Sequence, residues 1–534
     1  MELKRSRTDY LFLLGAGLAT AAAIWLRWAG LNAQSIWGDE GYTVWLSRLS
    51  PGEIWHNLLY DTGPPLYYVM QHYWGLQFGS SPTAIRALSA VFATLSWPLE
   101  YLLIRKIVAN RAAVVLALAF NAVSFLQIWY GQEARFYGLL LFLSLGSVYC
   151  LLLHLEKRSV VRFAGIVLCL TTSLYVHNMT LFYLPGLALL WALYPAETPL
   201  SVRAKDAVLA GSMVLLLYIP WLPTLRAQVR SVHHVFWYAT PTARDFLDTF
   251  SALCGLDLLT LQLIFRDKLH LHTTTLFGAW TWGPLVLAIF IAFLWRLAMR
   301  SPEGRKLLAV AAYAILPVLL VFAQSRLSTP MFVSRVLLTS SFFLPLVFCL
   351  PFTESTMPRK WIYQSVAILI LAGSAASCFI FPRRYHRDDW RGVTQYLVSE
   401  RESPRLVVVS PDLMQFMVQY YAPNPPAGME VSGLMSKYNP PDPDLQSRIL
   451  ELDQHADTLA PESWKKWEAY REVDLVLAAQ AFRTVNPTLE YLARRCASLE
   501  NVEFDHLEIK RCQLNEPASG GGDISAGESG GSVH

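Results

Sequence analysis

Long apolar runs recur along this chain, and they constrain its fold more than any other feature. Several approach the roughly 20 residues that an α-helix needs to cross the hydrocarbon core of a membrane. Of the 534 residues, 54% are hydrophobic and only 16% are charged, whereas a soluble domain carries about 25% charged residues. The sequence therefore predicts a polytopic α-helical membrane protein.

We expect eleven membrane spans. They cover residues 10–31, 84–104, 112–130, 136–154, 161–176, 179–195, 206–223, 276–295, 307–323, 334–352 and 361–381. The two spans that meet near His177 could instead form one long kinked helix. A cleavable signal peptide is the alternative for the first span, but its apolar stretch is long and no small-residue cleavage motif follows it.

The Lys and Arg residues indicate the orientation of these spans. With the N-terminus in the cytoplasm, every inner connection is basic, from Lys4, Arg5 and Arg7 at the start to Arg359 and Lys360 near the end. This is the pattern that the positive-inside rule describes. We therefore expect a multi-pass protein of the plasma (inner) membrane, with a cytoplasmic N-terminus and an extracytoplasmic C-terminal domain.

Three regions follow from this topology. Residues 1–382 form the transmembrane domain, with outer loops at 32–83 and 224–275. Residues 383–514 read as a small α/β extracytoplasmic domain, because "RLVVVS" and "VDLVLAA" are patterns of short buried strands. Residues 515–534 are rich in Gly and Ser and are expected to be disordered.

Two of the seven cysteines, Cys496 and Cys512, lie in the expected α/β domain. An oxidising compartment would make a disulfide between them plausible. Two unpaired thiols are the alternative, and the residues alone leave both open.

Two adjacent carboxylates, Asp39 and Glu40, stand in the first outer loop within "WGDEGYTVW". That segment, "SPGEIWHNLLY" and "GPPLYYVMQHYWGL" each predict a short helix, and their aromatic side chains, Tyr67 among them, suit the headgroup layer. Asp39 could simply cap a helix, with Glu40 complementing the helix dipole. A functional pair of carboxylates at the outer face is the other interpretation.

Three further polar clusters lie at outer ends of spans. Glu133 and Arg135, in "YGQEARFYGLL", form either a local ion pair or a site in which Arg135 holds a phosphate. His177 is either a packed, hydrogen-bonded side chain or a site residue. Arg335, in "SRVLL", faces either lipid headgroups or a ligand. Because the spans are largely free of acidic residues, these clusters favour chemistry at the outer interface over transport through the bilayer.

Taken in order, these segments resemble the glycosyltransferase family 39-like branch of the GT-C membrane glycosyltransferases. That group includes protein O-mannosyltransferases and aminoarabinose transferases that act on lipid A. The matching segments are "WGDEGYTVW", "TGPPLYYVMQHYW", "GQEARFYGLL", "LYVHNMTLFYL", "LYIPWLPTL", "SRVLL" and "YHRDDWRGVTQYL". The resemblance covers roughly residues 10–510. One departure is Val336, which follows Arg335 where the family often has Tyr.

The resemblance implies a GT-C fold of about 11 transmembrane helices and an inverting glycosyltransferase that uses a polyprenyl-phosphate sugar donor. The acceptor would be a lipid, a glycan or a protein at the outer face. Asp39 is then the catalytic base and Glu40 supports it, and Arg135 is the candidate to stabilise the departing phosphate. Arg335 is a second candidate for this role, mostly because of its inferred position at the outer face. Tyr67, Glu133 and His177 complete the substrate-binding candidates.

Other partners and functions have less support in the residues. No full set of metal ligands is evident, although two neighbouring carboxylates could hold a divalent cation. No Gly-rich phosphate loop indicates a nucleotide-sugar site, and membrane lipids rather than nucleic acid are the expected surroundings. A lipid-linked sugar flippase or transporter is the main alternative, and an inactive scaffold that binds envelope partners is a third.

Overall fold

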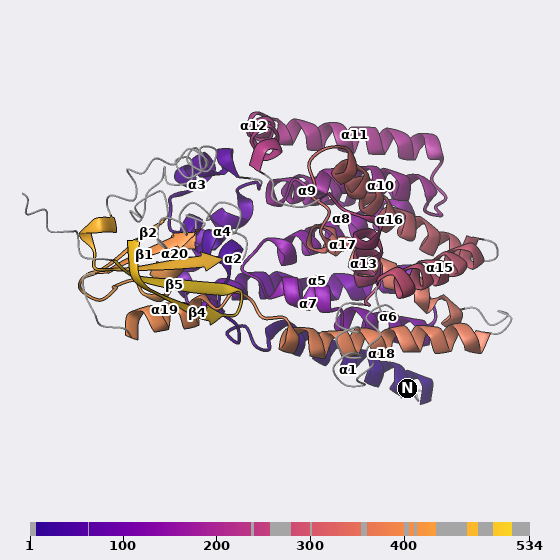
Figure 1. Ribbon diagram of the computed structural model, residues 1–534. Coiled ribbons are helices and arrows are strands. Elements are labelled where there is room, and N and C mark those ends of the chain that lie inside the picture. Colours follow the sequence, from indigo (N-terminus) through magenta and orange to yellow (C-terminus); the bar gives the residue numbers. More distant parts are fainter. Residues whose placement is uncertain are drawn as a thin grey trace, which may run out of the picture. The chain divides into compact units, whose positions relative to one another are not determined.

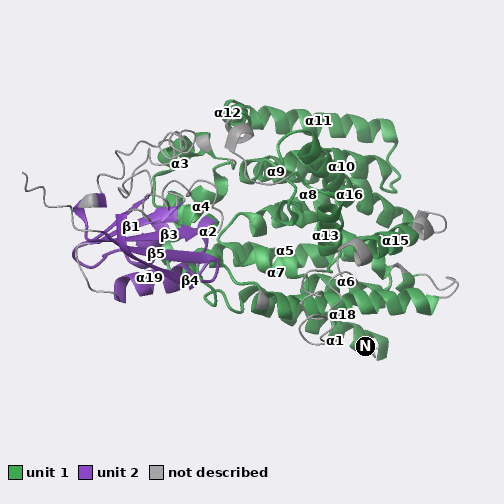
Figure 2. Ribbon diagram, viewed as in Figure 1, with its two compact units in different colours: residues 1–35, 39–387 green, residues 36–38, 388–534 purple. Residues whose placement is uncertain are grey.

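The computed structural model describes residues 7–61, 63–235, 240–256, 279–298, 302–353, 360–399, 405–410, 414–433, 467–478 and 495–514. The chain divides into two compact units, coloured separately in Figure 2. Unit 1 comprises residues 1–35 and 39–387, and unit 2 comprises residues 36–38 and 388–534. The expected disordered tail, 515–534, lies outside the described residues, as does 257–275 of the second outer loop.

Unit 1 is a bundle of apolar helices (Figure 1). They are α1 (Arg7–Trp28), α5 (Pro82–Ile107), α6 (Arg111–Ala122), α7 (Phe125–Gly131), α8 (Tyr137–Glu156), α9 (Val160–Val176), α10 (Thr180–Leu193), α11 (Leu200–Tyr218), α12 (Leu222–Val235), α13 (Ala243–Leu253), α15 (Ala279–Ala298), α16 (Pro302–Leu327), α17 (Leu338–Phe343) and α18 (Lys360–Arg384). Among the described residues, six helices are long and apolar enough to cross a membrane, or seven if the bent pair α6 and α7 is one span. The chain is therefore a multi-pass membrane protein.

In the described part of the chain, which contains the expected span 276–295 from Ala279 onward, all eleven expected spans coincide with apolar helical segments, but two of them are less regular than predicted. The expected span 112–130 is bent by 45° between α6 and α7, and Gln127 donates a hydrogen bond to Asn121 across this bend at 2.9 Å. The expected span 334–352 consists of two 3₁₀ segments around the short helix α17. Pro345 and Pro351 lie in the second 3₁₀ segment, and proline has no N–H for a regular helix.

The region around His177 contains two separate helices. The His177 ring lies 4.3 Å from the ring of Phe136, at the start of α8. Trp191, near the end of α10, lies 6.2 Å from His154, near the end of α8. Helix α10 therefore runs back along the length that α9 has just covered. The alternative of one kinked span is wrong.

Ion pairs join the expected inner connections at one end of the bundle. Lys106 pairs with Glu156 at 2.6 Å, and Arg158 pairs with Asp206 at 2.7 Å. Arg111 pairs with Asp9, near the start of α1. Figure 1 shows α2 and α4 at the end of the bundle opposite to the N-terminus of α1. This grouping agrees with the charge pattern, while the orientation across the membrane stays a prediction.

One buried polar cluster lies within the bundle and is an exception to the expectation that the spans are largely free of acidic residues. Arg27 of α1 donates to Glu100 of α5 at 3.4 Å and to Gln127 of α7 at 3.0 Å. Both charged side chains are fully buried, and the Arg27 guanidinium also lies 5.5 Å above the Trp97 ring.

The first outer loop folds into the three expected helices, α2 (Gly38–Ser47), α3 (Pro51–Asn57) and α4 (Leu66–Phe78). Ser50 and Glu53 form a capping box at the start of α3, with Pro51 in its first turn, which is a strong helix-start signal. Helix α4 ends at Phe78, and the Gly79 that follows has a φ of 79°, which suits a residue without a side chain. The start of α3 and the end of α4 therefore lie where the local sequence directs.

Unit 2 contains a mixed five-stranded sheet. Its strands are β1 (Arg405–Ser410), β2 (Met429–Gly433), β3 (Glu472–Ala478), β4 (Cys496–Phe504) and β5 (Leu507–Leu514), in the order β2-β1-β3-β5-β4. Strand β1 pairs in parallel with β2 and β3, whereas β5 pairs antiparallel with β3 and β4. The two expected buried strands correspond to β1 and β3.

In the described part of unit 2, the α-helices are α19 (Trp390–Ser399) and α20 (Gln415–Tyr421), and a 3₁₀ turn covers Trp467–Ala469. Helix α19 was expected from "DDWRGVTQYLVSE", whereas most of the other expected helix, "NPTLEYLARR", lies outside the described residues. Cys496 and Cys512 form a disulfide that joins β4 to β5. This settles the pairing that the sequence left open.

Candidate active site

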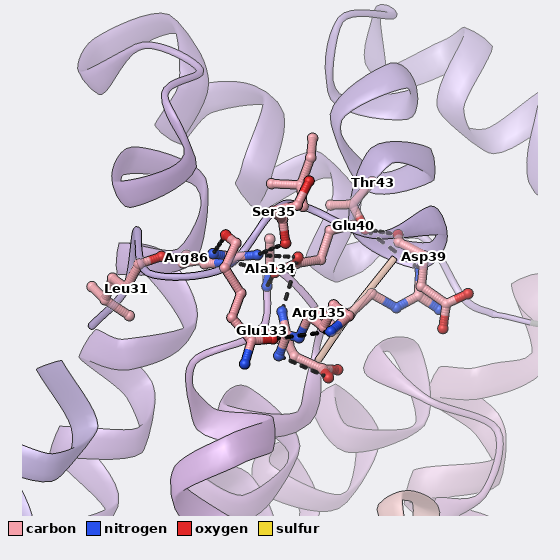
Figure 3. A network of polar contacts seen from close by, with 12 residues as sticks. Leu31, Ser35, Asp39, Glu40, Thr43, Arg86, Glu133, Ala134 and Arg135 are labelled. Atoms are coloured by element: carbon pink, nitrogen blue, oxygen red, sulfur yellow. Dashed lines mark hydrogen bonds and ion pairs between the residues drawn. The ribbon is translucent and has the colours of Figure 1, made fainter. Parts of the chain in front are cut away.

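The first turn of α2 places Glu40 inside a buried set of hydrogen bonds and Asp39 next to it. Glu40 is fully buried. One of its carboxylate oxygens accepts from Arg86 Nε at 2.7 Å and from the Ala134 N–H at 2.9 Å. The other accepts from Arg86 Nη2 at 2.5 Å and from Arg387 Nη1 at 3.0 Å. Figure 3 shows Glu40, Arg86 and Ala134 pointing toward one another.

Arg86 of α5 fixes the segment between α1 and α2. Besides its two bonds to Glu40, its guanidinium donates to the carbonyl oxygens of Leu31, Gln34 and Ser35 at 2.7, 3.0 and 2.9 Å. A guanidinium has five N–H donors, and each of them is used here. This contact therefore anchors both the start of α2 and the chain that leads to it.

Arg387 follows the last helix of unit 1 and bonds to two carboxylates. Its Nη1 donates to Glu40 at 3.0 Å and its Nη2 donates to Glu133 at 3.1 Å. The guanidinium carbon lies 4.6 Å from the centre of the Trp129 ring, a cation–π contact. Gln34 accepts from the backbone N–H of Arg387 and donates to the Tyr385 carbonyl, so the segment after α18 is held in place.

The two buried carboxylates differ in their proton affinity. Burial would raise the pKa of Glu40, but the charges and hydrogen bonds of Arg86 and Arg387 lower the pKa to about 2. Burial raises the pKa of Glu133 to about 7, because the charge of Arg387 offsets it only in part and Glu40 adds repulsion. Glu40 is thus a permanent anion, whereas Glu133 titrates near neutral pH.

Asp39 lies at the exposed side of this set. Its carboxylate accepts from Arg335 Nη1 at 3.2 Å, and the two side chains keep 26% and 18% of their surface exposed. Helix α2 begins one residue earlier, at Gly38, so Asp39 is inside the first turn. The arrangement leaves an accessible carboxylate directly beside a cation.

Arg135 differs from the other arginines of the site in its hydrogen-bond partners, which are a carbonyl oxygen and two hydroxyl oxygens. Its Nη1 donates to the Asp39 carbonyl, the Thr43 hydroxyl and the Tyr68 hydroxyl at 3.3, 3.4 and 3.1 Å, and its guanidinium lies 5.1 Å from the Phe136 ring. No carboxylate of the described residues lies within 4 Å of it. Its Nε is buried and has no hydrogen-bond partner there. The considered ion pair with Glu133 is not formed, because Glu133 binds Arg387.

Tyr67 and His177, the other expected substrate-binding residues, are both engaged within the protein. The Tyr67 hydroxyl is 2.7 Å from Ser89 Oγ, which donates to the Arg135 carbonyl at 2.7 Å. His177 Nδ1 accepts from the Met179 N–H at 2.9 Å. Burial, together with the charges of Arg135 and Arg335, lowers the pKa of His177 to about 3, so its imidazole is neutral and offers an Nε2–H donor.

The structure brings Asp39, Arg135 and Arg335 together, while their roles stay predictions, and it adds residues that the sequence analysis does not select. Arg86 and Arg387 hold Glu40, and Tyr68 binds Arg135. A signal for Arg86 existed, since an arginine within an apolar helix is costly and indicates a partner. Arg387 lies in "YHRDDW", but nothing local marks it as a partner of the first outer loop.

The described residues contain no group of three or more His, Cys, Asp or Glu side chains arranged to hold a metal ion. Both oxygens of Glu40 already accept from donors of the protein.

The architecture of the chain is the GT-C fold of polytopic membrane glycosyltransferases. The chain is similar to the crystal structure of ArnT from Cupriavidus metallidurans bound to undecaprenyl phosphate. The match covers 96% of this chain and 99% of the ArnT chain, with a TM-score of 0.51 and a sequence identity of 13%. The oligosaccharyltransferase of Archaeoglobus fulgidus, solved with Zn and sulfate, is 14% identical over 90% of this chain and 69% of its own, with a TM-score of 0.47.

The arabinofuranosyltransferase AftD from Mycobacteria is 13% identical over 96% of this chain and 42% of its own, with a TM-score of 0.43. No protein-family model matches the sequence. No curated protein matches it either. The relationship is thus one of fold.

Proposed function

We propose that the protein is an inverting glycosyltransferase that moves a sugar from a polyprenyl-phosphate donor to a hydroxyl acceptor at the outer face of the membrane. One observation carries the proposal: the accessible carboxylate of Asp39 lies beside Arg335 and close to Arg135, which has no carboxylate partner among the described residues. A base next to a guanidinium that no carboxylate of the described residues neutralises suits a reaction in which a hydroxyl loses a proton while a phosphate departs.

The reaction proceeds in a single displacement. Asp39 takes the proton of the acceptor hydroxyl as its oxygen forms a bond to the anomeric carbon. The bond between that carbon and the phosphate oxygen breaks, and the phosphate leaves with the electron pair. Arg135 and Arg335 stabilise the charge that develops on the phosphate. Attack from the face opposite to the phosphate inverts the anomeric configuration.

The remaining predicted residues take supporting roles. Glu40 is a positioning residue, because its carboxylate is buried and binds Arg86 and Arg387 while its neighbour Asp39 faces the exposed side. Tyr67 supports the backbone of Arg135 through Ser89. His177 would contribute a neutral N–H donor. Glu133 acts through Arg387.

The donor class is supported by the fold. The ArnT structure of the same fold carries undecaprenyl phosphate, and a single phosphate on a lipid is a suitable ligand for Arg135 and Arg335. We place the reaction on the extracytoplasmic side of the plasma (inner) membrane, with the N-terminus in the cytoplasm. The acceptor is a lipid, a glycan or a protein.

The test is Asp39→Asn in purified, lipid-reconstituted protein, supplied with undecaprenyl-phosphate sugars and an envelope extract as acceptor. We expect transfer to fall by about 10²–10⁴-fold, the usual contribution of a general base, while undecaprenyl phosphate still binds. Asp248→Asn is the matched control, because Asp248 lies in an exposed pair with Arg244 on α13. Unchanged transfer by Asp39→Asn would refute the assignment of the base.

The buried pair Arg27 and Glu100 is the one observation that favours the alternative of a lipid-linked sugar flippase, since transporters place charges within their spans. Vesicles with donor confined to the inner leaflet separate the two functions. Translocation of the donor without sugar transfer would favour the flippase. Transfer that requires donor in the outer leaflet would favour the enzyme.

A further inference from the structure

We propose that Arg387 is a positioning residue that binds Glu133 and thereby prevents this carboxylate from pairing with Arg335 of the phosphate site. The inference rests on the proposed function and adds a residue and a role to it. It arises from an imbalance of charges: the site holds a carboxylate, Glu133, that would compete with a phosphate if nothing else bound it.

Glu133 is close to the phosphate site in both sequence and space. It precedes Arg135 by two residues, and its side chain is almost fully buried. Only one of its oxygens is bonded, to Arg387, whereas its Oε2 is buried without a partner in the described part of the chain. Arg335 is the other cation whose charge acts on this carboxylate. Without Arg387, Glu133 would stay ionised only by pairing with another cation, and Arg335 is the one whose charge already reaches it.

Arg387 is held in a way that suits this role. Its guanidinium spans two carboxylates, from α2 and from the connection between α7 and α8, and it lies against the Trp129 ring. Its side chain is 8% exposed. Two donors of one planar fork bind two acceptors in fixed directions, which an ammonium group cannot reproduce.

Arg387 also connects the segment of the proposed base with the segment of a proposed phosphate ligand. Glu40 adjoins Asp39, and Glu133 lies two residues before Arg135, so the Arg387 guanidinium connects the segment of the base with the segment of the phosphate ligand. Moving either carboxylate would change how far the base stands from the phosphate. An enzyme needs reacting groups in a narrow range of positions.

The experiment compares Arg387→Met, Glu133→Gln and the double variant with the wild type. The measured quantities are the dissociation constant for undecaprenyl phosphate and the rate of sugar transfer. We expect Arg387→Met to weaken undecaprenyl phosphate binding by about tenfold or more, and Glu133→Gln to leave it close to the wild-type value. The double variant should regain most of the lost affinity, because the competing carboxylate is then neutral.

Arg244→Met is the control, since it removes an arginine from an exposed ion pair with Asp248. Size-exclusion profiles establish which variants fold. If Arg387→Met alone does not fold, the double variant is compared with Glu133→Gln. Equal affinities of these two variants for undecaprenyl phosphate support the proposal. A merely structural Arg387 predicts that the double variant binds undecaprenyl phosphate as weakly as Arg387→Met, and that result would overturn the inference. Wild-type protein that binds no undecaprenyl phosphate would overturn the proposed function as well.

Discussion

The anchoring of α2 by Arg86 leads to a quantitative expectation for Arg86→Met. The guanidinium is buried, pairs with Glu40 and donates to three carbonyl oxygens. Removing one partner of a buried ion pair costs about 3–5 kcal/mol. Each buried carbonyl oxygen that loses its hydrogen bond costs about 1–3 kcal/mol more. Glu40 keeps Arg387 and the Ala134 N–H, which lowers the first cost. Even with the first cost reduced, we expect a loss of at least about 5 kcal/mol in the free energy of unfolding.

The assay is a denaturant titration of the protein in detergent, followed by tryptophan fluorescence, for Arg86→Met, Glu40→Gln and the double variant. Residues in direct contact couple by about 0.5–3 kcal/mol, and a pair this buried should reach the upper part of that range. Arg111→Met is the control, because Arg111 pairs with Asp9 at the exposed end of the bundle and should cost at most about 1 kcal/mol. A cost for Arg86→Met no larger than that of Arg111→Met, or strict additivity with Glu40→Gln, would refute the reasoning.

Two further predictions concern other buried polar groups near the first outer loop. The raised pKa of Glu133, about 7, means that the folded state binds more protons than the unfolded state between about pH 4.5 and 7. The stability of the wild type should therefore fall as pH rises through this window, and Glu133→Gln should lack this slope in melting curves; parallel curves would contradict it. Gln71 of α4 is fully buried, with neither amide atom bonded among the described residues. Gln71→Met should raise the free energy of unfolding by about 1–3 kcal/mol, and a loss of stability would show that the amide has a partner.

The helices were the predictable part of the fold, because runs of apolar residues and their basic flanks are local in the sequence. The start of α3 in the first outer loop was equally predictable, since Pro51 and the capping box of Ser50 and Glu53 are local signals. The bend between α6 and α7 was not foreseen. It depends on how the side chains of Gln127 and Asn121 meet, and an apolar profile carries no information on such contacts.

The site was predictable only where a motif carried it. Asp39 and Arg135 were chosen from their segments, and the structure places them next to each other. The partners of Glu40 were not, because Arg86 is 46 residues away and Arg387 is 347 residues away. Pairing over such distances is decided by the packing of the helices. The role expected for Glu40 changed accordingly, from a neighbour that supports the base to the buried anchor of its helix.

The place of Arg387 in the chain matters for any dissection of the protein into parts. It is the last residue of unit 1, and Asp388 begins the main segment of unit 2. A truncation after residue 382, at the end of the apolar run, would remove this arginine together with unit 2. A loss of activity caused by the missing Arg387 would then be attributed to unit 2. Cutting after Arg387 separates the two contributions, and exchange of the C-terminal unit between homologous proteins should respect the same boundary.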